Sequence, residues 1–165
     1  MKIEKSAYVQ NFPFVAVGCV VRKDNEFLLV REARMDKGLW NQPGGWLDKG
    51  ENLVDGARRE VKEETGLDVQ IKGLLGVFNL VKRNHPEAKT DIHCVKIIFA
   101  AEVVGGELSF DKDEITEARW FSQEEIERME KDELRDMDIK IEVKNFIEDK
   151  IFPFERLIYH TETEY

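Results

Sequence analysis

Residues Gly45 to Leu67 read GWLDKGENLVDGARREVKEETGL and carry the clearest pattern in the 165-residue chain. Within this stretch, Asn52 to Thr65 consists mostly of helix-favouring residues, and apolar residues recur at helical spacing on one face. Those apolar residues are Val54, Ala57 and Val61. Gly66 follows the last turn, where a residue in the left-handed conformation commonly ends a helix. The pattern therefore predicts an amphipathic helix from Asn52 to Thr65.

Three glutamates lie on an arc of this helix beside the apolar face. Glu60 precedes Glu63 by three residues and Glu64 by four, and like charges at these spacings repel by about 0.2–0.5 kcal/mol per pair. Glu64 lies at the margin of the apolar face, where a desolvated carboxylate is costly unless it is paired or bound to a metal. A divalent cation would remove both costs. Taken alone, the three glutamates fit a solvated acidic face equally well, because the chain is 36% charged.

The residues before the helix favour the cation. Gly44 and Gly45 allow the backbone to approach a ligand or metal without a Cβ in the way. Glu51 is placed at the helix start, where the helix dipole favours a negative side chain. Arg59 is positioned to pair with Glu51 or a neighbouring carboxylate and to hold the acidic group in place.

The segment from Gly45 to Leu67 resembles the signature box of the Nudix hydrolase family without a departure. The identical positions are Gly45, Glu51, Arg59, Glu60, Glu63, Glu64 and Gly66. Such a set of identities at fixed spacing arises by chance at about 10⁻⁸ per starting position if each residue type occurs at roughly 7%. Pro43 before the two glycines, and Arg119 to Ser122 before a predicted helix, also resemble the family. The resemblance implies an α/β fold, an α/β/α sandwich with a central mixed β-sheet between the box helix and the carboxy-terminal helices.

The resemblance also implies a metal site, with Mg²⁺ as the cofactor and Mn²⁺ as a substitute. The implied ligands are Glu60, Glu63, Glu64 and the backbone carbonyl of Gly45. Glu51 would be a secondary ligand or a partner of Arg59, and Arg59 would support catalysis by holding the carboxylates. Many family members add a carboxylate from a late loop. Glu114 is the best candidate here, with Glu117 and Asp113 as competitors and an ordinary solvated acid as the alternative.

The implied reaction is Mg²⁺-dependent hydrolysis of a pyrophosphate bond in a nucleoside diphosphate derivative or a (d)NTP. Water activated by the metal would attack phosphorus in line, and Glu63 or Glu114 would take its proton. A catalytically silent Nudix domain that acts as a nucleotide-sensing module is the alternative, although such domains usually lose box carboxylates that this chain keeps. Isomerisation of an isoprenyl diphosphate needs a reactive cysteine, which Cys19 and Cys94 in apolar strands do not suggest.

Substrate contacts are expected outside the box. Arg31, Arg34 and Lys37 follow the second predicted strand and are placed to reach phosphates, although a solvated strand end fits as well. Residues 82–90 are predicted to form a basic loop. This loop either closes over an anionic ligand or is a plain surface connection. Its basic residues are Lys82, Arg83, His85 and Lys89. Trp40 and Phe78 are candidates to stack on a base, and the alternative for each is a place in the core. His93 lies in an apolar strand and is expected to be a buried imidazole.

Gln42 is a departure from the Leu or Phe that many family members carry before the Pro-Gly-Gly segment. Trp40 to Pro43 resembles a subgroup that acts on small pyrophosphates and on nucleoside di- and triphosphates. This weakens an automatic assignment of ADP-ribose as the substrate. Oxidised (d)NTPs, nucleotide sugars and a thiamine-precursor pyrophosphate therefore stay open as candidates.

Around the box, the chain alternates between strand-like and turn-like segments. Residues 12–22 and 27–33 predict a hairpin, residues 68–81 and 92–104 two more strands, and residues 118–121 a short strand. Ser122 begins a capping box that starts a helix, and residues 138–150 predict a second helix that alternates partly like a strand. Residues 41–46 contain Pro and two Gly and are expected to be irregular.

Length and charge limit the function. A chain of 165 residues with 42% hydrophobic residues suits one domain over residues 1–165, with an extension at 1–11 and a flexible tail at 161–165. A net charge of −9 argues against nucleic acid, and no segment suits a membrane span or secretion signal. Reduced, buried Cys19 and Cys94 agree with a cytoplasmic protein. The expected partner is a small nucleotide or pyrophosphate, and a homodimer is open.

Overall fold

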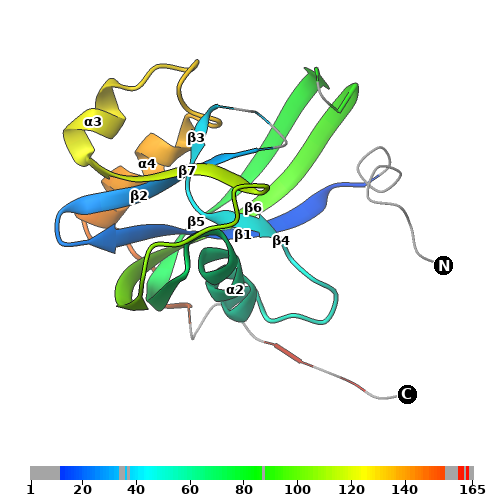
Figure 1. The fold of residues 1–165 in the computed structure, drawn as a ribbon. Helices are drawn as coiled ribbons and strands as arrows, with labels where there is room; N and C mark the ends of the chain where they lie inside the picture. Colours follow the sequence, from blue (N-terminus) through cyan, green and yellow to red (C-terminus); the bar gives the residue numbers. More distant parts are fainter. Residues whose placement is uncertain are drawn as a thin grey trace.

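The computed structural model describes residues 12–33, 36, 38–86, 88–154, 160, 161 and 163 (Figure 1). The strands are β1 (Phe14–Lys23), β2 (Glu26–Glu32), β3 (Trp40–Asn41), β4 (Gly44–Trp46), β5 (Leu67–His85), β6 (Thr90–Gly106) and β7 (Ile115–Ser122). The helices are α2 (Leu53–Thr65), α3 (Gln123–Arg128) and α4 (Asp138–Ile147). The proposed extension at residues 1–11 lies outside the described residues, and only Thr161 and Thr163 of the proposed tail lie within them.

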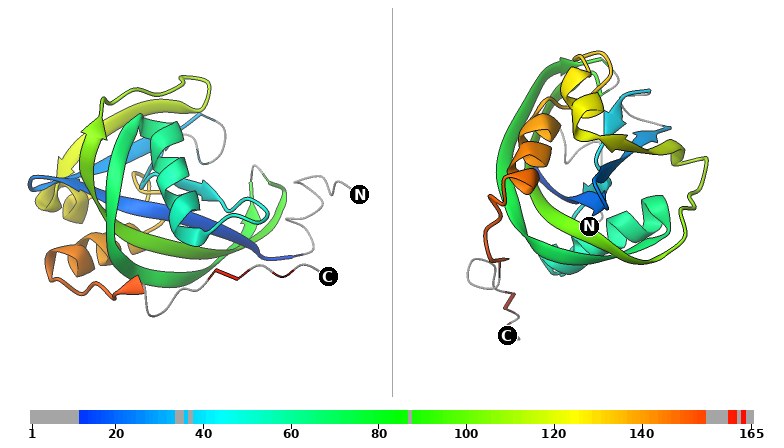
Figure 2. Two further views of the ribbon diagram at one scale, coloured as in Figure 1. Left: turned by 90° about the horizontal axis from the view of Figure 1, so that it is seen from below. Right: turned by 90° about the vertical axis from the view of Figure 1, so that its left-hand side faces the viewer.

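One mixed sheet contains all seven strands, with β1 near its centre. β1 pairs with β6 in parallel and, along its other edge, with β4 and then β2 in antiparallel orientation. β5 and β6 form a long antiparallel hairpin, while β3 and β7 pair with β2. Figure 2 shows α2 on one face of this sheet and α3 with α4 on the other. The α/β/α sandwich with a central mixed sheet is confirmed.

The side chains of β1 contribute to two hydrophobic cores, one on each face of the sheet, because successive residues of a strand point to opposite faces. Cys19 and Val21 pack with Ala57 and Val61 of α2 on one face. Val20 packs on the other face, in the cluster that contains most buried residues of α3 and α4. Its helical members are Ile126, Ile139, Val143 and Phe146. The sheet is therefore covered by helices on both faces.

The box helix forms where the sequence predicts it. The Asn52 side chain accepts a hydrogen bond from the Val54 amide at the amino terminus, and Gly66 adopts a left-handed φ of 71° at the carboxy terminus. All three residues of the predicted apolar stripe are buried. The capping box at Ser122 is also present, and both cysteines are buried free thiols.

Two predictions about the connecting segments are wrong. Residues 41–46 are not irregular throughout, because β4 pairs with β1 in the register Val17 to Gly45 and Gly18 to Gly44. The glycines allow this close pairing: a Cβ on Gly44 would lie 2.6 Å from the carbonyl oxygen of Val17. The expected loop at residues 82–90 is mostly strand, since β5 continues to His85 and β6 begins at Thr90.

The longest described helix, α2, has 13 residues. None of the helices in the described ranges is long and apolar enough to cross a membrane.

Candidate active site

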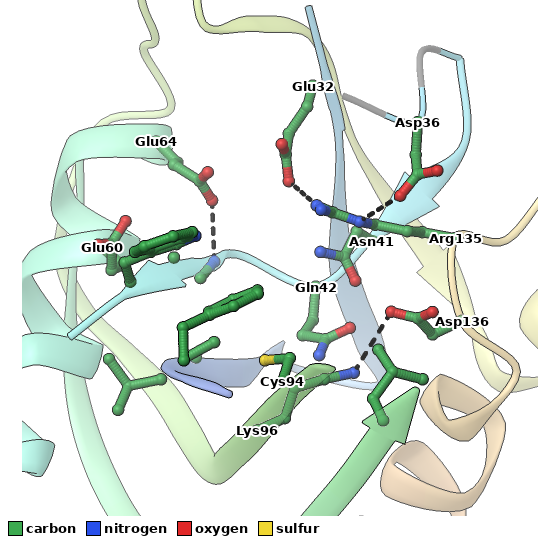
Figure 3. A pocket seen from close by; sticks show the side chains of 18 of the residues that line it. Glu32, Asp36, Asn41, Gln42, Glu60, Glu64, Cys94, Lys96, Arg135 and Asp136 are labelled. Carbon is green, nitrogen blue, oxygen red and sulfur yellow. Dashed lines mark hydrogen bonds and ion pairs between the residues drawn. The ribbon is translucent and has the colours of Figure 1, made fainter. Parts of the chain in front are cut away.

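A pocket of about 820 Å³ lies between α2, the β3–β4 segment and the first halves of β1 and β6 (Figure 3). This volume suits a ligand of nucleotide size. One wall carries the carboxylates of α2, and the opposite end carries a group of buried and half-buried residues, most of them polar. The labelled members of that group in Figure 3 are Asn41, Gln42, Cys94, Lys96, Arg135 and Asp136.

The glutamates of the box converge on this pocket. Glu60, Glu63, Glu64 and Gly45 all line it. Burial, together with the negative charge of Glu32 across the pocket, raises the pKa of Glu64 well above its usual value, although the Gly44 amide donates a hydrogen bond to it over 2.9 Å. Burial also raises the pKa of Glu60. Both carboxylates are therefore held in surroundings that disfavour a bare negative charge.

Arg59 supplies the positive charge that holds these acids. Its guanidinium donates to both carboxylate oxygens of Glu51, at 2.7 and 2.9 Å, to Glu60 at 2.8 Å and to Glu63 at 3.0 Å. The hydrogen bonds to Glu51 above all raise the pKa of Arg59, and they lower the pKa of Glu51. The predicted pairing of Arg59 with Glu51 is confirmed, and Arg59 offsets the repulsion between the glutamates.

The residues present fit a hard divalent cation. A Cβ on Gly45 would lie 2.4 Å from Glu60 Oε2, so the backbone of Gly45 and this carboxylate form a cradle that only glycine leaves open. Carboxylate and carbonyl oxygens are the donors that Mg²⁺ and Ca²⁺ prefer. Among the described residues the side chains do not form a preassembled metal cluster, because Arg59 engages Glu60 and Glu63 while Glu64 faces the Gly44 amide.

The late loop brings one of its three candidate acids to the pocket. Glu114 lines it, and its backbone carbonyl accepts a hydrogen bond from Ala33 over 2.8 Å, which ties the loop to the end of β2. Glu117 instead accepts a hydrogen bond from Arg31 at 2.8 Å, and neither it nor Asp113 lines the pocket.

The substrate contacts expected of three residues are not supported. Trp40 is 4% exposed and packs edge-to-face on Phe121 in the core, because its side chain points to the α3–α4 face of the sheet. The Arg31 guanidinium covers the ring of Trp40 at 4.1 Å and does not reach the pocket. Arg83 is exposed on the β5–β6 hairpin, where it pairs with Asp91. Arg34 and Lys37, which were also predicted to reach phosphates, lie outside the described residues.

Two of the four basic residues at positions 82–90 of the β5–β6 hairpin, Lys82 and His85, face the protein. Lys82 lies 2.9 Å from an Asp36 oxygen and 3.1 Å from an Asp136 oxygen. His85 is buried and hydrogen-bonded to Asp36 at 2.9 Å. These contacts hold the hairpin to the pocket rim and engage Lys82 and His85, whereas Lys89, like Arg83, is exposed.

Arg135, on the segment between α3 and α4, was missed by the sequence reasoning. It pairs with Glu32 and, at 2.9 Å, with Asp36, and all three line the pocket (Figure 3). Burial raises the pKa of Glu32 despite this partner. No local pattern identifies Arg135, because its partners lie about a hundred residues earlier in the chain.

Lys96 carries a signal that the sequence reasoning overlooked: it is a lysine at an inward position of an apolar strand. Ile92, Cys94, Lys96 and Ile98 are buried in alternation, which places His93 on the other side, partly exposed and bonded to Asn79. The expectation of a buried His93 is therefore wrong. Lys96 Nζ lies 2.9 Å from Asp138, 3.6 Å from the fully buried Glu142 and 3.8 Å from Asp136.

Comparisons with known proteins agree with this arrangement. The model of the NUDIX domain family matches residues 13–140. An ADP-ribose pyrophosphatase of Methanocaldococcus jannaschii is 36% identical over 118 residues, which are 71% of this chain and 66% of that protein, just under two thirds of its length. Phosphatase NudJ of Escherichia coli K12 is 37% identical over 116 residues, 69% of this chain and 71% of NudJ. A solved NUDIX hydrolase from Nitrosomonas europaea superimposes with a TM-score of 0.74 at 28% identity, covering 89% of this chain and 97% of that one.

Proposed function

Because the chain belongs to the Nudix hydrolase family, we propose that it hydrolyses a pyrophosphate bond in a nucleoside diphosphate derivative or a (d)NTP, with Mg²⁺ as cofactor. The observation that carries the proposal is that the complete box places Glu60, Glu63, Glu64 and Gly45 on one wall of a nucleotide-sized pocket. Nudix hydrolases use divalent metal ions, and the oxygen donors of this wall suit such an ion.

The box carboxylates and the Gly45 carbonyl would hold the cation, which would neutralise charge on the phosphate oxygens. Arg59 orients Glu60 and Glu63 through its hydrogen bonds, and the Gly44 amide orients Glu64. A water molecule attacks phosphorus in line, so that a new P–O bond forms while the anhydride P–O bond breaks. The proton of this water passes to Glu63 or Glu114, which are exposed carboxylates at the border of the pocket.

The test is a substrate panel with Mg²⁺ or Mn²⁺ in ¹⁸O-labelled water. Oxidised (d)NTPs, nucleotide sugars, ADP-ribose and a thiamine-precursor pyrophosphate represent the open substrate classes. We expect metal-dependent turnover of at least one of them, with ¹⁸O in the product whose phosphorus was attacked. Release of AMP, of a monophosphate with pyrophosphate, or of orthophosphate separates the classes. Absence of turnover across the panel overturns the proposal.

A nucleotide-sensing module is the second reading, and tight nucleotide binding without turnover in the same panel would favour it. The intact box argues for catalysis, because each charged residue among its identical positions lines the pocket or, as Glu51 does, contacts a residue that lines it. The cytoplasmic location and the homodimer stay predictions; native mass and fractionation measurements test them.

A further inference from the structure

Two adjacent amide side chains lie buried on the pocket lining opposite the box carboxylates. Gln42 is 2% exposed and Asn41 is 9% exposed, and both line the pocket. Their side-chain oxygens, Gln42 Oε1 and Asn41 Oδ1, have no hydrogen-bond partner among the described residues. Figure 3 shows both amides between the Arg135–Asp136 segment and Lys96, away from Glu60 and Glu64.

An unpaired buried amide oxygen lowers stability, because it has given up hydrogen bonds to water without replacing them. An unbranched apolar side chain would fill the place of Gln42 without that cost. Two such oxygens, on consecutive residues that line a ligand-sized pocket, therefore point to groups that gain their partners from a ligand.

The charges at this end of the pocket show which part of a ligand it suits. Lys96 is surrounded by Asp136, Asp138 and Glu142, and Arg135 is engaged by acidic partners. These cations are already neutralised, so they offer little attraction to a phosphate. The diphosphate belongs at the box carboxylates and their cation, and the uncharged part of the substrate belongs at the amides.

The chain limits the distance between the amide end of the pocket and the end that carries the box carboxylates. Gln42 lies only three residues before Gly45, so their Cα atoms are at most roughly 10 Å apart. A ligand that reaches both ends must carry its uncharged group close to its diphosphate, as a nucleotide does.

A side-chain amide offers an acceptor beside a donor, and its complement is a donor beside an acceptor. Adenine presents this pair in its amino group and adjacent ring nitrogen, which Asn and Gln recognise with two hydrogen bonds. Apolar residues of the same pocket, among them Ala16, Leu80 and Ile98, provide surface for a ring. We infer that Gln42, with Asn41, selects substrates whose base carries an amino group next to a ring nitrogen, adenine above all. This inference rests on the proposed function, because it assumes that the diphosphate lies at the box.

The test compares three non-hydrolysable ligands in the presence of Mg²⁺ by calorimetry. They are α,β-methylene ADP, the same compound with unsubstituted purine in place of adenine, and methylenebisphosphonate, which has no nucleoside. The variant is Gln42→Met, which keeps an unbranched side chain of similar size. The control is Gln70→Met, the same change at an exposed position of β5 outside the pocket.

We expect the unchanged protein to bind the adenine compound at least about tenfold more tightly than the purine compound. In Gln42→Met this ratio falls below about twofold, with little change in affinity for the purine compound, whereas Gln70→Met keeps it. The melting temperature of ligand-free Gln42→Met stays the same or rises, because an unpaired oxygen is removed.

Equal binding of the adenine and purine compounds by the unchanged protein overturns the inference, as does equal binding of methylenebisphosphonate. A base preference that persists in Gln42→Met also overturns it. A lower melting temperature of Gln42→Met would show that the amide has a structural partner instead. Base preference without turnover of any substrate supports the inference and overturns the hydrolase proposal. Turnover without base preference supports the hydrolase proposal and overturns the inference.

Discussion

The backbone amide of Gly44 donates a hydrogen bond of 2.9 Å to Oε2 of Glu64, and so joins β4 to α2. Glu64 is the most deeply buried of the three box glutamates, and a backbone donor positions it without the entropy that a flexible partner side chain would lose. The geometry of this carboxylate therefore depends on the pairing of β4 with β1, which sets the position of Gly44.

Replacing Glu64 with Gln tests this carboxylate as a metal ligand. The amide oxygen of Gln can still accept the hydrogen bond from Gly44, so we expect the fold to persist while the negative charge is lost. We expect kcat to fall by about 10²–10⁴-fold, since loss of the charge removes several kcal/mol of metal-assisted stabilisation. Steady-state kinetics over a range of Mg²⁺ concentrations measures the change. The exposed Glu124→Gln on α3 is the control, and near-full activity of Glu64→Gln would refute the ligand assignment.

Arg59→Lys tests the guanidinium that connects three carboxylates. A lysine ammonium cannot make the paired hydrogen bonds to Glu51 and reach Glu60 as well. We expect a loss of about 10–100-fold in activity or metal affinity, as for other residues that orient metal ligands. The neighbouring Arg58→Lys, at a residue paired only with Asp55 in the described contacts, should change neither quantity. Equal effects of the two substitutions would contradict the positioning role.

Gly45→Ala tests the cradle beside Glu60. The added Cβ would lie 2.4 Å from one carboxylate oxygen of Glu60 and 2.8 Å from the other, so the carboxylate must move. We expect the Mg²⁺ concentration for half-maximal activity to rise by about 10–100-fold. Gly105→Ala is the matched control, because its Cβ would have its nearest contact at 3.5 Å. An unchanged metal requirement in Gly45→Ala would mean that Glu60 does not bind the metal from this position.

The raised pKa of Glu142 predicts how the stability of the fold depends on pH. Burial raises its pKa to about 8, against 4.5 for the ordinary group, although Lys96 lowers it. Between these values the folded protein keeps a proton that the unfolded chain releases, so stability falls as pH rises, by up to roughly 1.4 kcal/mol per pH unit. Glu142→Gln removes this dependence. Urea unfolding at several pH values between 5 and 8 should show the variant gaining on the unchanged protein as pH rises; a constant difference would contradict the protonated state of Glu142.

Much of the fold follows from local patterns. The hairpin of β1 and β2, the helix α2 with its Asn52 cap and Gly66 stop, and the capping box at Ser122 all depend on neighbouring residues, so short stretches of sequence predict them. The box spacing also predicts that three glutamates lie together, because helical geometry alone fixes positions 60, 63 and 64.

The opposite end of the pocket was decided by the tertiary structure. Arg135 meets Glu32 and Asp36 only when the segment before α4 folds back on β2, and Lys96 meets Glu142 only when α4 packs on the sheet. Trp40 and Arg31 show the converse, since the sequence suggested substrate contacts, whereas Trp40 is buried in the core and Arg31 covers its ring outside the pocket lining. Sequence by itself determined the helix and its acidic chemistry, because periodicity and capping act over a few residues. The pairing of distant strands decided which buried polar groups face that chemistry, because such contacts depend on register and packing that no local pattern encodes.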